Sequence, residues 1–185
     1  MRTLGEAWTW YEHNRTLLNM MERLGDRYWS ELPWDGRLGN DHRFRLLEGI
    51  QVADMARGVL GEFDDLAIFV MFSVFESIVR RMVAEDLQPE VAALRHEALQ
   101  KSAAKLMQNI AQGSFSNNIL ELFKRKGQQP DHQPINSLVE EVNRVRHYRN
   151  WVAHGRKEAD RPKPMLPRNA YDNMQAFLEH IRRPG

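Results

Sequence analysis

The sequence predicts an all-α protein, a bundle of about five to seven helices. Three observations predict this class. Apolar residues recur at helical spacing in several long segments, no segment alternates polar and apolar residues as a half-buried strand does, and the chain contains no repeat or low-complexity tract. With 185 residues, 42% of them hydrophobic and 28% charged, the chain can bury a substantial core.

Residues 1–60 are predicted to form an N-terminal helical segment that packs on a core built from residues 61–185. A helix is expected from Glu6 to about Arg27, where aromatic residues, Leu and Met recur at helical spacing. Turns are expected at residues 32–36 and 38–41, which are rich in Pro, Gly, Asn and Asp. A further helix is expected from Phe44 to Leu60, although two glycines lower its intrinsic propensity.

The strongest helical signal covers Glu62 to about Leu87. Gly61 precedes this helix, acidic residues in its first turn favour its N-terminus, and Pro89 is expected to stop it. Residues 66–75 are apolar around most of the helix circumference, which is typical of a central, buried element.

Shorter elements are expected after this helix. An apolar stripe predicts another helix that ends at Gly113, with Leu99, Ala103, Leu106 and Ile110 on one face. A short helix is expected from Ser114 or Ser116 to Lys124, closed by Gly127, and a loop is expected over residues 128–134. After the helix described next, we expect an extended connector with Pro162, Pro164 and Pro167 and a closing helix over residues 169–183.

The helix predicted over residues 135–155 carries the pattern that points to function. Its inner face is marked by five apolar residues: Ile135, Leu138, Val139, Val142 and Val145. Arg149 falls in the middle of this stripe, Arg146 lies beside it, and Gly155 is expected to cap the C-terminus. A polar ridge, defined as Asn143, His147, Asn150 and His154, runs along one edge of the stripe.

An arginine on an inner face requires an acidic partner, because breaking a buried ion pair typically costs about 3–5 kcal/mol. Glu76 lies on the inward arc of the helix predicted over residues 62–87. We therefore expect Glu76 to pair with Arg149 or Arg146 across a helix–helix contact. Such a pair is either a plain structural ion pair or part of a functional site, and the sequence leaves both readings open.

The charge distribution favours a local anion-binding surface over a global one. The net charge is only +1, yet the stretch from Arg144 to Arg168 contains eight basic residues against two acidic ones. Such a patch is suited to a phosphate backbone, although charged stretches are more often simply solvated surfaces.

Several classes of chemistry are excluded or disfavoured. The chain has no cysteine, which excludes disulfides, thiolate metal sites and cysteine nucleophiles. His147 and His154 lie about 10 Å apart along the helix axis, too far to share a metal ion, and no cofactor fingerprint is present, so we expect no metal and no cofactor. No signal peptide or membrane-spanning stretch is evident, so we expect a cytoplasmic protein without a membrane partner.

The segment Arg149-Asn150-x-x-x-His154 resembles the R-x(4–6)-H motif of the HEPN superfamily, including the polar residue directly after the arginine. The long apolar helix with an inward acidic residue, here Glu76, is also similar to that group. The resemblance covers about residues 62–155. It implies a HEPN-like helical bundle that forms a two-fold homodimer, and metal-independent cleavage of RNA to 2′,3′-cyclic phosphate ends. It also implies a toxin or anti-phage defence role, with a possible antitoxin or regulatory protein as partner.

The resemblance also implies roles for individual residues. His154 would act as a general acid or base, Arg149 would stabilise charge on the phosphoryl oxygens, and Asn150 would orient one of these groups. The supporting residues would be Glu76, Arg146 and His147, the last two as phosphate ligands, and the RNA backbone would be bound by Arg144, Arg156 and Lys157. Because residues five apart on a helix point about 140° apart, one chain alone would present Arg149 and His154 poorly.

Two other functions compete with the ribonuclease interpretation. The chain could be a non-catalytic HEPN-like interaction or scaffold module in which Arg149 and His154 only stabilise a dimer. It could also be an RNA-binding regulatory module that uses the basic stretch from Arg144 to Arg168 without turnover.

Overall fold

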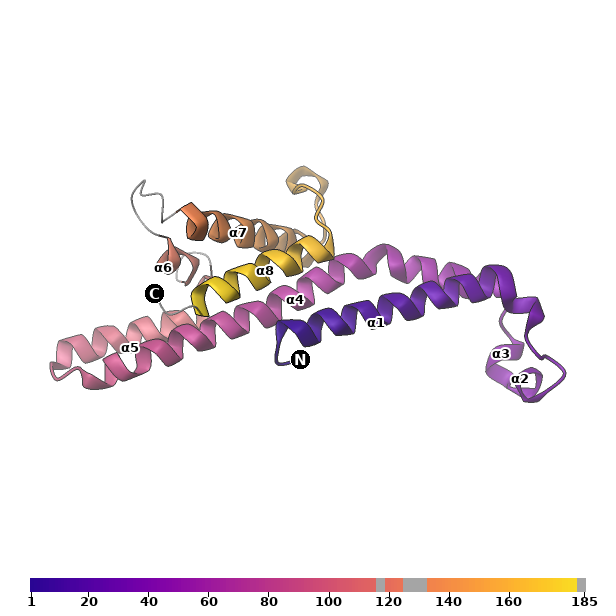
Figure 1. Ribbon diagram of the computed structural model, residues 1–185, viewed down its shortest axis with the longest axis horizontal. Coiled ribbons are helices and arrows are strands. Elements are labelled where there is room, and N and C mark those ends of the chain that lie inside the picture. The colour runs from indigo at the N-terminus through magenta and orange to yellow at the C-terminus, as the bar shows by residue number, and fades with distance from the viewer. Residues whose placement is uncertain (116–118, 125–132, 183–185) are drawn as a thin grey trace. The chain divides into compact units, whose positions relative to one another are not determined.

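The computed structural model describes residues 1–115, 119–124 and 133–182, and in these ranges it is all-α, with no strand (Figure 1). The all-α class predicted from the sequence is therefore confirmed for these ranges. The chain divides into two compact units: a core unit of Met1–Ala7 and Ile68–Gly185, and a hairpin unit of Trp8–Ala67. No helix in the described ranges combines the length and the hydrophobicity that crossing a bilayer demands.

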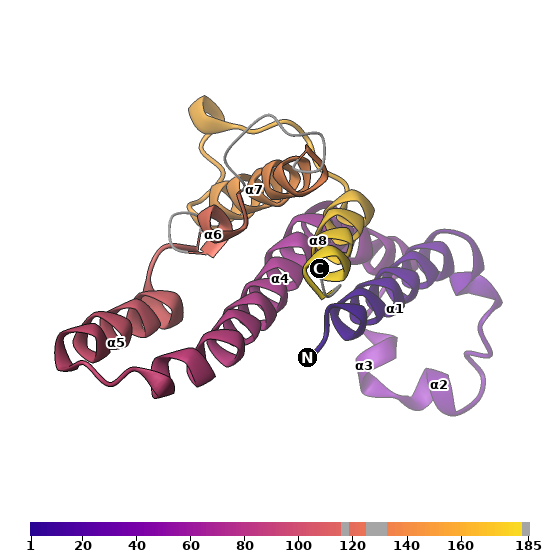
Figure 2. The ribbon, with the colours of Figure 1, turned by 60° about the vertical axis from the view of Figure 1, so that its left-hand side comes forward.

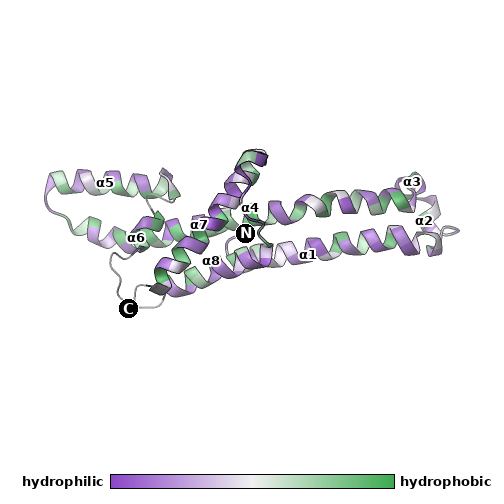
Figure 3. Cartoon of the chain, turned by 90° about the horizontal axis from the view of Figure 1, so that it is seen from above, coloured by the Kyte–Doolittle hydropathy of each residue, from purple (hydrophilic) through white to green (hydrophobic). Residues whose placement is uncertain are grey.

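The hairpin unit consists of most of α1 and the first part of α4, which lie side by side (Figures 1 and 3). Helix α1 spans Leu4–Arg23 and continues as a π-helical turn over Leu24–Tyr28 and a 3-10 turn over Trp29–Glu31. Two single helical turns follow, α2 (Arg37–Asn40) and α3 (His42–Arg45), so part of the second predicted turn is helical.

A glycine pair allows a close backbone approach within the hairpin unit. A Cβ atom on Gly25 would lie 2.4 Å from the carbonyl oxygen of Gly49 and 2.7 Å from the backbone nitrogen of Ala53. No side chain fits there, because both neighbours are backbone atoms. Elsewhere in the hairpin unit, the Tyr11 hydroxyl donates a hydrogen bond of 2.8 Å to Asp64, and burial together with this carboxylate raises the pKa of Tyr11 to about 12.

Helix α4 runs without interruption over Gly49–Ala93. The prediction of two helices separated near Gly61 is therefore wrong, and so is the prediction that Pro89 stops the second one. Each glycine weakens a helix by about 1 kcal/mol. The burial of one continuous face across the glycines outweighs that cost, and this face includes Val52, Ala53, Ala56, Phe63, Ala67 and Met71. Pro89 lies four residues before the C-terminal end of α4. A proline removes the hydrogen bond to the carbonyl four residues earlier, so here the disturbance is confined to the end of the helix.

The core unit adds four helices to the second part of α4: α5 (Glu97–Gln112), α6 (Glu121–Phe123), α7 (Gln133–Ala153) and α8 (Pro167–Arg182) (Figure 2). Helices α7 and α8 pack on each other. Most of the largest fully buried side chains come from α4, α7 and α8, and they include Phe72, Phe75, Val79, Val139, Met174 and Phe177. The residues predicted at Ser116, Gly127 and most of the loop at 128–134 lie outside the described ranges.

Helix α5 differs from the expectation in one respect. Its amphipathic pattern is present, but Leu99 and Leu106 are 54% and 42% exposed, and of the four residues in the predicted stripe only Ile110 is buried. Periodicity identifies the apolar side of a helix. It does not specify whether another element of the same chain covers that side.

Helix α7 ends as its sequence predicts. Gly155 has a φ of +84°, its N–H donates to the carbonyl of Val152, and the N–H of Arg156 donates to the carbonyl of Trp151 at 3.0 Å. These two bonds form a Schellman motif, which satisfies carbonyls that the end of a helix leaves without partners. The motif fixes the direction in which the chain leaves α7 and places His154 at the C-cap.

Candidate functional site

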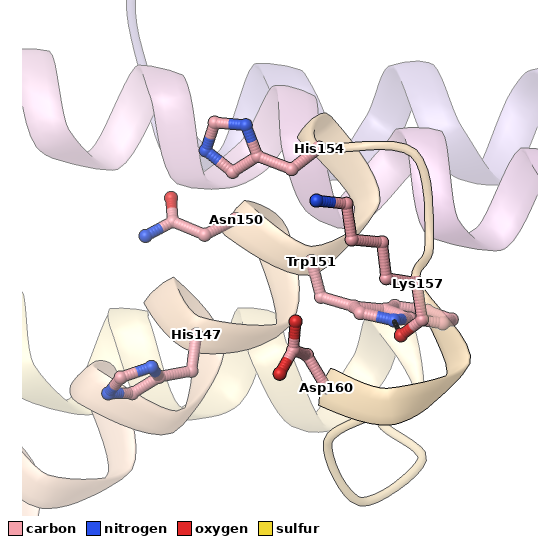
Figure 4. A pocket seen from close by; sticks show the side chains of 6 residues that line it. All are labelled: His147, Asn150, Trp151, His154, Lys157 and Asp160. Carbon is pink, nitrogen blue, oxygen red and sulfur yellow. Dashed lines mark hydrogen bonds between the residues drawn. The ribbon is translucent and has the colours of Figure 1, made fainter.

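The polar ridge of α7 forms one wall of an open pocket of about 210 Å³. Three of its members, His147, Asn150 and His154, follow one another along the same side of the helix (Figure 4). Trp151, Lys157 and Asp160 complete the lining. The predicted ridge residues are thus brought together, with the exception of Asn143, which lies at the start of the ridge and does not line this pocket.

Arg149 lies on a different side of α7 and faces α4. Its guanidinium carbon is 5.2 Å from the ring centre of Phe69 and 5.4 Å from that of Phe72. Its Nη2 is 3.4 Å from a carboxylate oxygen of Glu76, and its Nη1 donates a bond of 3.0 Å to the side-chain oxygen of Asn150. The expected pairing with Glu76 is therefore confirmed for Arg149.

The Nε of Arg149 is buried and has no hydrogen-bond partner in the described part of the chain. A buried donor without a partner costs free energy. Arg149 also does not line the 210 Å³ pocket. Asn150 is the link between the two features, because it accepts from Arg149 and lines the pocket.

Glu76 also binds a cation that the sequence interpretation missed. The Nε of Arg80 donates to Glu76 at 3.0 Å, and its Nη2 donates to the carbonyl of Gly113 at 2.8 Å. Arg80 also donates to the carbonyl of Ile110. The signal was available in the sequence, because Glu and Arg four residues apart on a helix lie on the same side. Glu76 is thus shared by two arginines, one from its own helix and one from α7.

Arg146 contacts Asn143 and His147 directly, and the charge of Glu76 acts on it without a direct ion pair in the described residues. The Nε of Arg146 donates to Asn143 at 2.8 Å, and its Nη2 lies 3.2 Å from Nε2 of His147. Burial, and next the charge of Arg149, lower the pKa of Arg146. Burial and the charge of Arg146 lower the pKa of His147 below its usual 6.5.

The lowered pKa makes His147 predominantly neutral at pH 7. Because a guanidinium only donates, we assign the acceptor role to Nε2 and the proton to Nδ1 of His147. A neutral imidazole contributes no charge to phosphate binding, so this environment favours His147 as a proton acceptor over the cationic ligand that the sequence suggested. Its side chain lies on the ridge and lines the pocket.

His154 is exposed and lies at the C-cap, five residues from Arg149. Arg149 contacts α4, whereas His154 lines the open pocket, so one chain does not bring the two side chains together. The predicted RNA-binding residues are spread along the same region. Lys157 lines the pocket, and Arg156 lies just after the C-cap. Arg144 lies about three helical turns before His154 and pairs with Glu141 at 2.8 Å.

Trp151 packs on the chain that follows α7. Its indole N–H donates to the carbonyl of Lys157 at 2.9 Å, and its ring is 5.6 Å from the ring of Tyr148. The indole bond anchors the connector and thereby positions Lys157 and Asp160 at the pocket.

The described residues include no group of three His, Asp or Glu side chains arranged to hold a metal ion. The pocket instead offers one imidazole held neutral, a second exposed imidazole, an amide and an ammonium group. Its volume accommodates a phosphate group. The Asp160 carboxylate partly offsets the ammonium of Lys157, so the pocket itself is not strongly cationic.

Comparison of the chain with protein-family models, with curated protein sequences and with solved structures gives no match. The resemblance to the HEPN superfamily therefore depends on Arg149, Asn150, His154 and Glu76 and on the helices that carry them.

Proposed function

We propose that the protein is a HEPN-like, metal-independent endoribonuclease that acts as a two-fold homodimer. The observation that carries the proposal is the position of Asn150. It joins an arginine held by Glu76 to a pocket lined by two imidazoles and an ammonium group. These are the groups that cleavage of a phosphodiester needs: a proton acceptor, a proton donor and fixed positive charge.

The two-fold dimer is proposed because one chain leaves the constellation incomplete. Arg149 faces α4 and His154 faces the open pocket, so a phosphate in the pocket of one chain meets its His154 but not its Arg149. Two α7 helices related by a two-fold axis would place the His154 pockets next to each other. A phosphate between them would be in reach of an imidazole from each chain.

The proposed reaction is an internal transfer that needs no metal ion. A neutral imidazole removes the proton from the ribose 2′-hydroxyl, and the 2′-oxygen forms a bond to phosphorus. The bond from phosphorus to the 5′-oxygen breaks, and an imidazolium donates a proton to that oxygen. The products are a 2′,3′-cyclic phosphate and a 5′-hydroxyl. DNA lacks the 2′-hydroxyl and is not a substrate.

Each residue has a stated part in this proposal. His154 and His147 exchange protons with the substrate, the second as the acceptor favoured by its lowered pKa. Arg149, held by Glu76, positions Asn150 at the pocket and stabilises negative charge on the phosphoryl oxygens through that amide. Binding of the flanking RNA backbone is assigned to Arg144, Arg146, Arg156 and Lys157.

The test is incubation of the purified protein with transfer RNA and total RNA in EDTA, with His154→Ala and Arg149→Ala beside the wild type. The matched control is His180→Ala, which removes another exposed histidine, on α8. We expect fragments from the wild type and His180→Ala and at least a hundredfold loss in His154→Ala, the usual scale for loss of a general acid or base. Equal cleavage in all four samples would refute the proposed site.

One observation favours a second candidate, the non-catalytic interaction module. Arg149 has an ion pair, an amide partner and two aromatic neighbours, which is a sufficient structural role for an arginine. In that case Arg149→Ala would reduce folding stability or dimerisation, and neither the wild type nor any variant would cleave RNA. An RNA-binding regulatory module would bind RNA in a salt-dependent manner and release it intact.

The proposal includes the cellular role that the resemblance implies. The protein would be a cytoplasmic toxin or anti-phage effector, kept inactive by an antitoxin or another regulatory protein. Expression of the wild type in a bacterial host is then expected to stop growth, and His154→Ala is expected to be tolerated. Growth arrest by both proteins alike would argue against a toxic ribonuclease.

A further inference from the structure

A second and larger pocket, of about 450 Å³, lies between α7, the connector that follows it and the start of α8. His147 lines both this pocket and the smaller one. Glu141, in the larger pocket, and His154, in the smaller one, are thirteen residues apart, which corresponds to about 20 Å along the helix axis. A ligand could therefore occupy the larger pocket while a phosphate occupies the smaller.

We name the larger cavity the proline pocket. Its walls on the connector and α8 are formed by Pro162, Lys163, Pro164, Met165, Asn169 and Asn173. The two prolines and the methionine provide apolar surface without flexible polar groups. Asn169 and Asn173 are one turn apart on α8, so both amides lie on the same side of that helix.

The α7 wall of the proline pocket provides charge. Glu141 and Arg144 line it and pair with each other at 2.8 Å, and Glu141 also accepts from the Asn173 amide at 3.4 Å. The Arg144 side chain is 65% exposed, so its guanidinium is open to further partners. Lys163 adds a second cation from the connector.

This combination matches the parts of a nucleotide. Amide side chains pair with base edges, and in particular with adenine, through one donor and one acceptor. Proteins recognise unpaired RNA bases by stacking on aromatic rings or guanidinium planes and by hydrogen bonds at the base edge, and here Pro162, Pro164 and Met165 supply the surface for the ring. Guanidinium and ammonium groups bind the phosphate. The volume lies within the range of about 300–1,000 Å³ that is typical of small-molecule sites.

We propose that the proline pocket binds one unpaired nucleotide of the RNA substrate, adjacent to the phosphate that is cleaved. The base lies against Pro162, Pro164 and Met165, its edge meets the amides of α8, and its phosphate meets Arg144 and Lys163. This inference depends on the proposed ribonuclease function for the identity of the substrate, but the binding of a nucleotide can be measured without any cleavage.

The experiment uses AMP and a short single-stranded RNA with the His154→Ala protein, so that cleavage cannot obscure binding. Calorimetry gives the affinity for AMP, and amide spectra of the isotopically labelled protein give its location. We expect AMP to shift the side-chain amide signals of Asn169 and Asn173 and to compete with the RNA. We also expect Lys163→Ala and Asn169→Ala each to weaken AMP binding at least fivefold. The matched control Lys105→Ala, an exposed lysine on α5, should not change it.

The outcomes separate this inference from the proposed function. If the wild type cleaves RNA but AMP binds nowhere or binds independently of Lys163 and Asn169, the nucleotide site is wrong and the ribonuclease stands. If AMP binds at the two asparagines but RNA is never cleaved, the pocket stands and the ribonuclease fails. If AMP binds there without competing with RNA, the pocket serves a free nucleotide and the assignment to the RNA substrate is overturned.

Discussion

The ion pair between α4 and α7 provides the most specific test of the structure. Glu76 is the acceptor shared by Arg149 and Arg80, and the three side chains are 20%, 26% and 17% exposed. In Glu76→Gln the shape is kept and one oxygen can still accept a hydrogen bond, but the negative charge is lost. Two arginines then remain close together on a largely apolar surface formed in part by Phe69 and Phe72.

The loss of folding stability expected for Glu76→Gln lies between two known limits. Exposed ion pairs contribute about 0–1 kcal/mol, and breaking a fully buried pair costs about 3–5 kcal/mol. The three side chains are mostly but not completely buried, and each arginine keeps another acceptor: Asn150 for Arg149, and the carbonyls of Ile110 and Gly113 for Arg80. We therefore expect a loss of about 2 kcal/mol, which for a chain of this size lowers the melting temperature by about 4–8 °C.

The assay is thermal unfolding followed by circular dichroism, with Glu97→Gln as the matched control. Glu97 also pairs with a cation four residues ahead, Lys101 at 2.7 Å, but both side chains are more than three-quarters exposed, at 78% and 76%. Its replacement should cost no more than about 1 kcal/mol. If Glu76→Gln and Glu97→Gln have the same effect, the shared ion pair does not stabilise the contact between α4 and α7, and the reasoning about Arg149 is refuted.

Three further predictions concern the two units separately. Gly25→Ala should destabilise the hairpin unit by about 2 kcal/mol or more, because its Cβ would meet the backbone at Gly49. Gly58→Ala should instead stabilise α4 by about 0.5–1 kcal/mol, because the space around Gly58 is open. Denaturant unfolding that changes the stability of both variants in the same direction would contradict this. Gly155→Ala should cost about 1–2 kcal/mol, since its φ is +84°, and an unchanged melting temperature would exclude a strained C-cap. Because folding lowers the pKa of His147, the contribution of this residue to stability is present above about pH 6.5 and is lost as the pH falls through the folded-state pKa. The melting temperature of the wild type should therefore fall more between pH 7.5 and 5.5 than that of His147→Gln. Equal falls in both proteins would show that His147 does not couple to folding.

The features of α7 could be predicted because they depend on local chemistry. A helical period identifies the buried face that includes Val139, Val142 and Val145, and the same period identifies the ridge that carries His147 and Asn150. The C-cap followed from the conformational preference of glycine. The partner of Arg149 was found by charge logic, since a half-buried cation requires an anion on the facing helix.

Other features depend on packing at a distance and were not accessible in the same way. The local cost of two glycines suggested a break in α4, but the continuous burial of its inner face decides that the helix is one. The exposure of Leu99 and Leu106 on α5 depends on which elements fold over that helix. The connector residues Asp160 and Lys163 reach the pockets only through the three-dimensional path of the chain after α7.

The most direct test of the proposed reaction is the chemistry of the RNA ends. After a cleavage position is mapped, an RNA with a single 2′-deoxy nucleotide on the 5′ side of that bond should be incubated with the wild-type protein in EDTA beside the unmodified RNA. The proposal predicts 2′,3′-cyclic phosphate ends from the unmodified RNA and no cleavage at the modified position. Cleavage of the 2′-deoxy RNA at the same bond, or products that carry a 5′-phosphate, would contradict attack by the 2′-hydroxyl and with it the roles assigned to His154 and Arg149.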